Sequence, residues 1–334
     1  MTSTEAESTT TPRRLNRHTA LSFLARYGTL AVLALMILGF GIASPEAFLS
    51  QRNLINILNQ SALLAIVACG LTFVLVAGQF DLSFGNVISL SGILAVGLMV
   101  RSGLPTPVAV ALALAAGVAV GLFNGFLVSA LRVNAIVATL GTSTILLGLN
   151  FLYSNGIPIT LEGGDLTSIA RGRVLGIPVP ILIMIGVLAL AWLLLNRTLV
   201  GHHLQAIGAN PTASRLAGVR VDRVTVVAFV VGSFCASIGG VVLAARIGSG
   251  QVTAGDGYLL SAFAAVFLGA SVIKDGQFHI LGTFVGVLIV AVTFNGLSIL
   301  GAPSSAQYLV QGGILIAAVA LSTLSRRVLG AQRK

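Results

Sequence analysis

Long apolar runs, separated by short polar or basic segments, fill the chain after about residue 22. A helix needs about 20 mostly apolar residues to cross the hydrocarbon of a bilayer. About ten such runs occur, which predicts an all-α polytopic membrane protein with about ten transmembrane helices. We expect the eighth span to be broken or tilted because its apolar run is short. The predicted spans are residues 26–43, 55–77, 82–100, 106–131, 135–156, 178–196, 223–245, 258–272, 279–299 and 306–325.

The pattern predicts one transmembrane domain, residues 23–327, between two cytoplasmic tails. Residues 1–22 begin with a Ser/Thr-rich stretch without apolar periodicity, which favours disorder. Residues 328–334 form the second tail. Residues 197–222 make the largest predicted cytoplasmic loop, so a soluble partner would find most of its surface there.

Composition and charge agree with a chain dissolved in lipid. The sequence is 56% hydrophobic and only 8% charged, whereas a soluble domain is about a quarter charged. The net charge of +10 comes from residues scattered between apolar runs, so we expect no nucleic-acid partner. About 14 of the 19 Lys and Arg residues fall in segments that the predicted spans place on the same side of the membrane as the N-terminus. The positive-inside rule therefore predicts that both termini are cytoplasmic.

A weak internal repeat points to two related halves. Phe123-Asn124-Gly125 in the fourth span recurs as Phe294-Asn295-Gly296 in the ninth, and Cys69 and Cys235 fall in the second and seventh. An offset of five spans reverses orientation, which predicts an inverted repeat of spans 2–5 and 7–10, as many transporters have. A three-residue match can also arise by chance.

The sequence lacks the residue patterns that catalysis, metal binding and ATP hydrolysis require, which excludes several classes of function. We expect no catalytic residue, metal site or bound cofactor, because the four histidines lie in or beside cytoplasmic segments and the pair His202-His203 is too sparse for a metal. A Walker loop needs Gly-Lys-Ser/Thr, but Lys274 precedes Asp275 and the other lysine is the last residue. Any ATP hydrolysis therefore belongs to another subunit. An ion-coupled secondary carrier stays open as the alternative, although only Asp81 lies near membrane depth and such carriers need ionisable relays.

The cytoplasmic loop contains a short, well-delimited helix. Asn210 suits an N-cap, Pro211 follows at the first helical position, and Gly218 stands where the helix should end. About two turns are too few for a helix that is stable alone in water. We therefore expect a docking partner to hold it; a helix lying on the membrane surface is the alternative, which the lack of a bulky apolar face disfavours.

Several polar or small residues inside the spans are candidates for a solute pathway or for packing. Helical spacing places Asn53, Asn56 and Gln60 on one face, where amides could bind sugar hydroxyls. Hydrogen bonding between helices is the alternative for every pathway candidate. Further candidates are Asn86, Asn124, Thr139, Thr142, Asn150 and Asn295.

Two other features concern packing and gating. Gly117, Gly121 and Gly125 form a ladder of small residues that we expect to seal two spans together, with a subunit contact as the alternative. Asp81, between Gly78 and Gly85, is predicted to cap the following helix or to act in gating.

Three stretches resemble the permease family of bacterial ABC importers for ribose, xylose, arabinose and related compounds. Gly78–Gly85 resembles the family's Gly-Gly-Ile-Asp-Leu-Ser-x-Gly, although Gln79 and Phe80 replace Gly and Ile. Ala206–Gly218 is similar to its coupling segment. Residues 257–297 are similar to its C-terminal signature, except that Leu259–Ser261 replace Glu-Leu-Asp. These departures weaken any assignment of the solute.

The resemblance implies a transport subunit without an ATPase site of its own, in the bacterial cytoplasmic (inner) membrane. Its implied partners are a second permease subunit, identical or not, cytoplasmic subunits that bind ATP and Mg, and an extracytoplasmic solute-binding protein. The solute would be a sugar or a sugar-like compound. The residues implied to contact the ATPase are Ala206, Gly208, Asn210, Pro211, Ala213, Arg215, Leu216 and Gly218.

Overall fold

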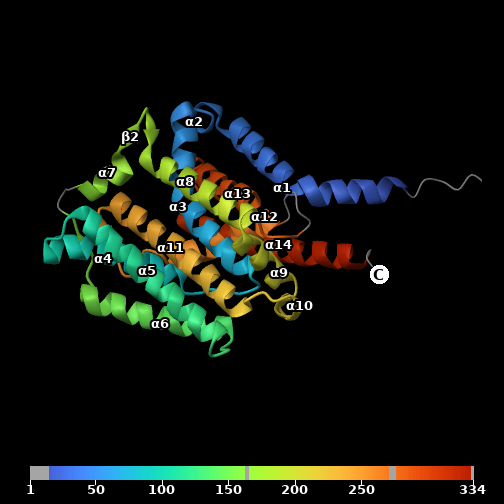
Figure 1. Cartoon of the computed structure of the whole chain (residues 1–334). Helices are drawn as coiled ribbons and strands as arrows, with labels where there is room; N and C mark the ends of the chain where they lie inside the picture. The colour runs from blue at the N-terminus through green and yellow to red at the C-terminus, as the bar shows by residue number, and fades with distance from the viewer. Residues whose placement is uncertain (1–14, 162–164, 271–275, 332–334) are drawn as a thin grey trace, which may run out of the picture.

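The computed structural model describes residues 15–161, 165–270 and 276–331, and these form a bundle of long helices (Figure 1). Four short strands lie between them. The helices are α1 (Leu15–Ala43), α2 (Pro45–Phe48), α3 (Gln51–Val76), α4 (Phe84–Ser102), α5 (Thr106–Ser129), α6 (Ala135–Ser154), α7 (Asp165–Arg171), α8 (Val179–Arg197), α9 (Leu199–Ala209), α10 (Pro211–Leu216), α11 (Val221–Ile247), α12 (Asp256–Ala270), α13 (Ile280–Ile299) and α14 (Ser304–Ala331).

The strands form two small antiparallel pairs. β2 (Arg173–Val174) pairs with β3 (Ile177–Pro178) in a tight hairpin. β1 (Ile159–Thr160) pairs with β4 (Ser249–Gly250), so the segment after α6 is tied to the segment after α11.

Two long helices, α3 and α11, cross at the centre of the core. They approach so closely because glycines face each other: a Cβ placed on Gly70 would lie 2.8 Å from the carbonyl oxygen of Gly232. The same Cβ would lie 2.6 Å from the Cβ of Cys235. Cys69 and Cys235 are both free and buried at this crossing, as their apolar sequence context indicates.

The glycine ladder of α5 packs against α11 within the same chain. A Cβ on Gly121 would lie 2.7 Å from the carbonyl oxygen of Phe229, and one on Gly125 would lie 2.9 Å from the Cα of Val226. Gly117 faces Ser237 in the same manner. The ladder therefore seals two helices of one subunit, as predicted.

The predicted spans all coincide with helices, but fewer helices qualify as spans by length and composition. Among the described residues, seven are long and apolar enough to cross a membrane: α3, α4, α5, α6, α8, α11 and α13. α12 has 15 residues up to Ala270, and residues 271–275, which follow it, lie outside the described residues, so the short, broken or tilted eighth span stays a prediction. The total of ten spans stays a prediction, because α1, α12 and α14 do not meet this measure in the described residues.

The predicted tails are only partly described. Residues 1–14 and 332–334 lie outside the described residues, and so do Lys274 and Asp275. Leu15 already begins α1, within the segment predicted as a disordered tail, and α14 continues to Ala331.

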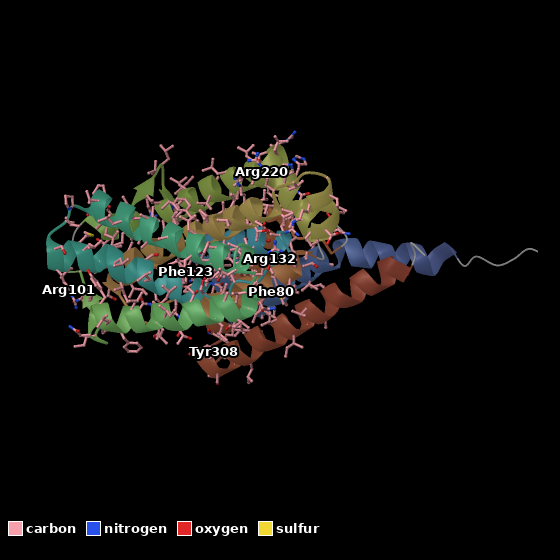
Figure 2. All side chains as sticks on the ribbon, turned by 60° about the horizontal axis from the view of Figure 1, so that its bottom comes forward. Phe80, Arg101, Phe123, Arg132, Arg220 and Tyr308 are labelled. Atoms are coloured by element: carbon pink, nitrogen blue, oxygen red, sulfur yellow. The ribbon has the colours of Figure 1, made fainter. Side chains whose placement is uncertain are left out.

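The two ends of the bundle differ. The start of α1, the end of α14 and the short helices α9 and α10 lie at one end, whereas α7 and β2 lie at the other (Figure 1). Figure 2 shows Arg132 and Arg220 near the first end and Arg101 at the second. We call the end with α9 and α10 the loop end.

Candidate functional site

The helix predicted between Asn210 and Gly218 is confirmed as α10. The Asn210 side chain accepts a hydrogen bond of 3.0 Å from the amide of Ala213, which satisfies one of the free amides of the first turn. Pro211 is the first helical residue. Gly218 has φ +84°, a left-handed conformation in which glycine carries no steric penalty. Local sequence therefore fixes both ends of this helix.

α9 ties the loop end to the core. Leu204 and Ile207 are buried in a cluster with Phe73 and Val76 of α3. Gly208 lies so close to the carbonyl group of Val76 that a Cβ there would be 3.1 Å from the carbonyl carbon. A displacement of α9 must therefore also move the end of α3.

The outward side of α9 and α10 is open. Leu216 is 87% exposed at the end of α10. Leu216 therefore lies uncovered on the outward side of α10. A helix of only six residues is not stable alone in water, so contacts with other parts of a complex would help to hold it. All eight residues predicted to contact an ATPase are exposed: Ala206, Gly208, Asn210, Pro211, Ala213, Arg215, Leu216 and Gly218.

Charged groups connect α10 to its neighbours. Arg215 donates a hydrogen bond of 3.2 Å to the Asp222 carboxylate at the start of α11, and the Arg132 guanidinium lies 3.9 Å from the other oxygen of that carboxylate. All three side chains are about half exposed, so each pair contributes at most about 1 kcal/mol. The Arg215–Asp222 pair thus joins α10 to the start of α11 but stabilises it little.

Asp81 lies in a buried turn between α3 and α4. Its carboxylate accepts hydrogen bonds from the Ser83 amide (2.8 Å) and the Ser83 hydroxyl (2.6 Å), and Asn124 of α5 donates to it at 3.4 Å. Ser83, not Asp81, is the N-cap residue of α4. The carboxylate therefore shapes the turn one step before the helix instead of bonding to its first-turn amides.

The same turn is joined to α6. The Leu82 amide donates to the Thr139 hydroxyl at 3.0 Å, and Asn124 also donates to the Ser83 hydroxyl at 2.9 Å. Because Gly78 before the turn directly follows the part of α3 that Gly208 contacts, the loop end and the Asp81 turn share one helix end.

The pathway candidates do not gather at one place. Asn86, Asn124 and Thr142 are buried between α4, α5 and α6, where Asn86 donates to the Ser143 hydroxyl at 2.9 Å. Asn295 lies between α13 and α3. Asn56 is exposed and Gln60 half buried on α3.

Most of these amides have a partner on another helix. Asn295 and Asn53 exchange two hydrogen bonds, of 3.0 and 2.9 Å, and Asn150 donates to the Asn86 carbonyl oxygen at 3.4 Å. Bonding between helices thus accounts for much of the polarity inside the spans. Their role in a pathway stays a prediction.

Sequence reasoning missed one long-range aromatic cluster. Phe80, at the Asp81 turn, stacks on Phe263 of α12 with ring centroids 6.1 Å apart, and Phe267 and Phe278 continue the row. No local pattern pairs residues so far apart in the chain. The departure of Phe80 from the family motif was the only signal.

The described residues contain no cluster of three or more His, Cys, Asp or Glu side chains that could hold a metal ion.

Comparison with known proteins gives a consistent family. Residues 53–319 match the family model described as the permease component of branched-chain amino acid transport systems. The chain is 37% identical to the ribose import permease of Escherichia coli K12 over 310 residues, 91% of this chain and 95% of that protein. The ribose import permease of Haemophilus influenzae is 36% identical over 301 residues, 89% of this chain and 93% of that protein.

A third relative transports another pentose. The L-arabinose transport permease of Escherichia coli K12 is 35% identical over 306 residues, 88% of this chain and 89% of that protein. No solved structure matches the chain significantly. The match over most of the chain shows that this protein belongs to the permease family that includes these ribose and arabinose import permeases.

Proposed function

We propose that this chain is the transmembrane half of an ATP-driven importer and that it carries a sugar or a sugar-like polyol into the cytoplasm. The observation that carries the proposal is the exposed surface of α9 and α10, which is built onto the end of α3 through Gly208. A cytoplasmic ATPase subunit would bind this surface around Leu216. The relatives' transport of ribose and arabinose supports a monosaccharide as the solute.

The loop end would face the cytoplasm of a bacterium, with both termini on that side. The basic residues Arg132, Arg215 and Arg220 at this end support the orientation. A second permease subunit would complete the pore, and a solute-binding protein would deliver the sugar at the end with α7 and β2. The ATP and Mg would be held entirely by the ATPase partner.

The packing of the two halves supports an inverted repeat. α3 and α11 cross at Gly70 and Gly232, and each contacts the helix that carries the Phe-Asn-Gly motif of the other half: α5 lies against α11 and α13 against α3. Related halves of this kind allow an inward-open and an outward-open arrangement of similar energy.

Coupling would pass along α9 to α3. Motion of a bound ATPase would shift α9, and the Val76–Gly208 contact would carry that shift to Gly78 and the Asp81 turn. The partner's nucleotide state would then favour one pore conformation because its contacts with α9 and α10 differ between the two.

The test is to purify the tagged chain gently from its own membranes and to identify its companions by mass spectrometry. We expect a stoichiometric ATPase, lost when Ala213→Glu and Leu216→Glu are combined. Leu175→Glu is the matched control, because Leu175 is 98% exposed at the opposite end between β2 and β3. A folded chain that is active in uptake without an ATPase would overturn the proposal.

An uncoupler separates the importer from an ion-coupled carrier. Uptake driven by ATP persists when the ion gradient collapses, whereas uptake by a carrier stops. The family membership favours the importer.

A further inference from the structure

The segment between α11 and α12 turns back into the bundle. After β4, residues 251–255 run along α4 toward its first residues: a Cβ on Gly250 would lie 2.7 Å from the Cα of Ile93, and the Gly255 amide donates to the Ser89 hydroxyl at 3.0 Å. A Cβ on Gly85 would lie 3.6 Å from the Cα of Asp256. At 1.5 Å per residue, the contact moves about 12 Å along α4.

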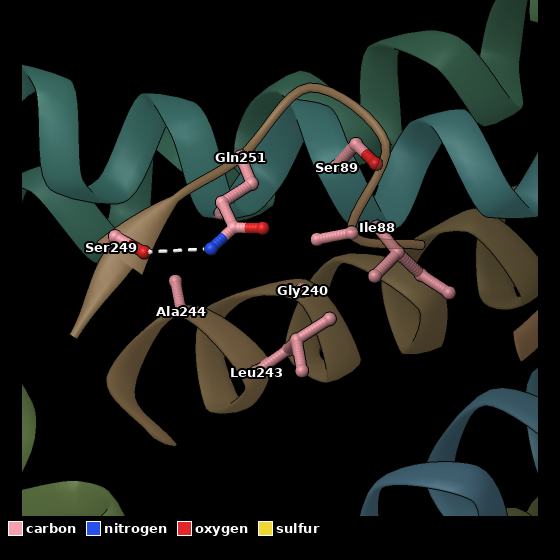
Figure 3. A pocket seen from close by; sticks show the side chains of 9 residues that line it. Ile88, Ser89, Gly240, Leu243, Ala244, Ser249 and Gln251 are labelled. Atoms are coloured by element: carbon pink, nitrogen blue, oxygen red, sulfur yellow. Dashed lines mark hydrogen bonds between the residues drawn. The ribbon is translucent and has the colours of Figure 1, made fainter. Parts of the chain in front are cut away.

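Figure 3 shows this re-entrant segment beside two helices. Ser249 and Gln251 lie on the extended chain, where the Gln251 amide donates to the Ser249 hydroxyl at 3.2 Å. Ser89 of α4 and Leu243 of α11 lie next to it. The segment is thus packed on one side by α4 and α11.

Asp256 consequently begins α12 part of the way along the bundle and not at either of its ends. Gly85, its neighbour on α4, is about 26 Å along that helix from Ser102, at 1.5 Å per residue. On the other side, Asn124, which bonds to the turn before α4, is about 8 Å from the end of α5. The carboxylate therefore lies at a depth that the hydrocarbon would occupy around the bundle.

The outer side of the segment is polar and open. The side chains of Thr253 and Asp256 are exposed, and Gly257 has nothing within 4 Å of a Cβ. In the described part of the chain, the Asp256 carboxylate has no hydrogen bond or ion pair. Irregular backbone and a free carboxylate are not tolerated against lipid, but both occur where they line a water-filled cavity.

The face of α8 shows the contrast. Its exposed side chains before the terminal Arg197 are apolar, with Leu190 at 69% exposure and Leu182 and Ile185 on the same helix. Such a face suits lipid. Exposed apolar side chains, as on α8, thus indicate contact with lipid, whereas the exposed polar side chains of Thr253 and Asp256 indicate contact with water.

We propose that Thr253, Asp256 and Gly257 form one wall of the water-filled translocation pathway and that the Asp256 carboxylate accepts hydrogen bonds from the hydroxyls of the passing solute. The proposal deepens the function proposed above and rests on it for the solute. Gln311 of α14 holds this wall in place by donating to the Gly257 carbonyl oxygen (3.3 Å) and the Ser261 hydroxyl (2.7 Å).

A carboxylate suits a neutral polyol. It offers two oxygens that only accept, so it can bind two neighbouring hydroxyls at once without a matching charge on the solute. Phe80, 37% exposed and stacked on Phe263 of the same helix, adds an aromatic surface toward the loop end. The wall thus combines acceptors with an apolar face.

Cysteine labelling tests the wall without knowledge of the solute. Both native cysteines are buried, so Cys69→Ala and Cys235→Ala give the background. Thr253→Cys and Asp256→Cys are then treated, in native membranes with the partners present, with a membrane-impermeant trimethylammonium methanethiosulfonate. We expect both to react, because only a thiol in water ionises and meets this reagent.

The experiment has one negative and one positive labelling control. Leu190→Cys on the lipid face should stay unlabelled, and Leu175→Cys at the exposed hairpin should react. If Thr253→Cys and Asp256→Cys stay unlabelled while Leu175→Cys reacts, a second copy or lipid covers the wall and the proposal is wrong. Gly257→Cys, with open space around it, decides the case if either variant does not fold.

Uptake of radiolabelled D-ribose and L-arabinose tests the hydrogen bonds. We expect Asp256→Ala to lower uptake about tenfold or more, since a charged acceptor is lost, and Asp256→Asn to retain part of it. Unchanged uptake by Asp256→Ala would remove the binding role. Failure of the importer proposal is separate: it appears as a missing ATPase in the purified complex, whether or not position 256 is labelled.

Discussion

The contact between α5 and α11 makes a quantitative prediction at Gly121. In Gly121→Ala, the new Cβ would lie 2.7 Å from the Phe229 carbonyl oxygen and 2.7 Å from the Cα of Val230. Both are backbone atoms, so no side chain can turn away and the helices must separate. Overpacking of this kind costs about 1–3 kcal/mol, and the better helix propensity of alanine returns up to about 1 kcal/mol.

We therefore expect Gly121→Ala to lose about 1 kcal/mol and Gly121→Leu about 3 kcal/mol or more. The assay is the thermal unfolding of the detergent-purified protein, followed by tryptophan fluorescence or by loss of the monodisperse peak on gel filtration. Gly148→Ala and Gly148→Leu on α6 are the matched controls, because nothing lies within 4 Å of a Cβ at that glycine. These controls should unfold at the temperature of the native protein or slightly above it, because the gain in helix propensity is not offset by a clash.

The reasoning fails if Gly121→Leu and Gly148→Leu both unfold at the temperature of the native protein. That result would mean that α5 and α11 do not touch at the ladder, and the contact would then belong to another subunit or to lipid. A loss at Gly148 equal to that at Gly121 would instead show that this assay does not sense helix packing.

Three further predictions concern hydrogen bonds. Asn210→Ala removes the cap of α10, worth about 1 kcal/mol, so the ATPase should be recovered in lower yield, whereas Asn210→Ser should restore it. Asn53→Ala leaves the Asn295 amide without this partner. The fall in unfolding temperature of the double variant Asn53→Ala/Asn295→Ala should therefore be smaller than the sum of the falls in the two single variants. Asp81→Asn should fold and keep its uptake, because an amide oxygen still accepts from Ser83; uptake lost by a folded Asp81→Asn would show instead that the charge acts in gating.

Local signals in the sequence were sufficient for the long helices and for α10, but not for α9 (Leu199–Ala209), which lies in the segment predicted as a cytoplasmic loop. Asn210, Pro211 and Gly218 act on their own backbone, so their order along the chain predicts α10 directly. The ladder of Gly117, Gly121 and Gly125 likewise predicts a close helix contact, because a spacing of four places all three on one face. Such features need no knowledge of distant residues.

Long-range partners could not be predicted in the same way. The sequence shows that Asn86 and Asn124 are polar inside spans, but it does not show whether they face water or another helix. In the structure, Asn124 bonds to the Asp81 turn and Asn86 to α6. The re-entrant segment before Asp256 could not be predicted from the sequence either, because only its contact with α4 distinguishes it from an ordinary loop.

The burial of α3 has a consequence for how the protein is made. Its middle and end are enclosed mainly by α8, α11, α12 and α13, and Thr72 shares a hydrogen bond of 2.8 Å with Thr283. The ribosome synthesises these partners only after more than half of the chain. Until then α3 must wait in lipid, or beside a chaperone or the insertion machinery, without the hydrogen bonds that Asn53 exchanges with Asn295. Chains that stop before α11 should therefore be unstable in the membrane and be cleared by its proteases.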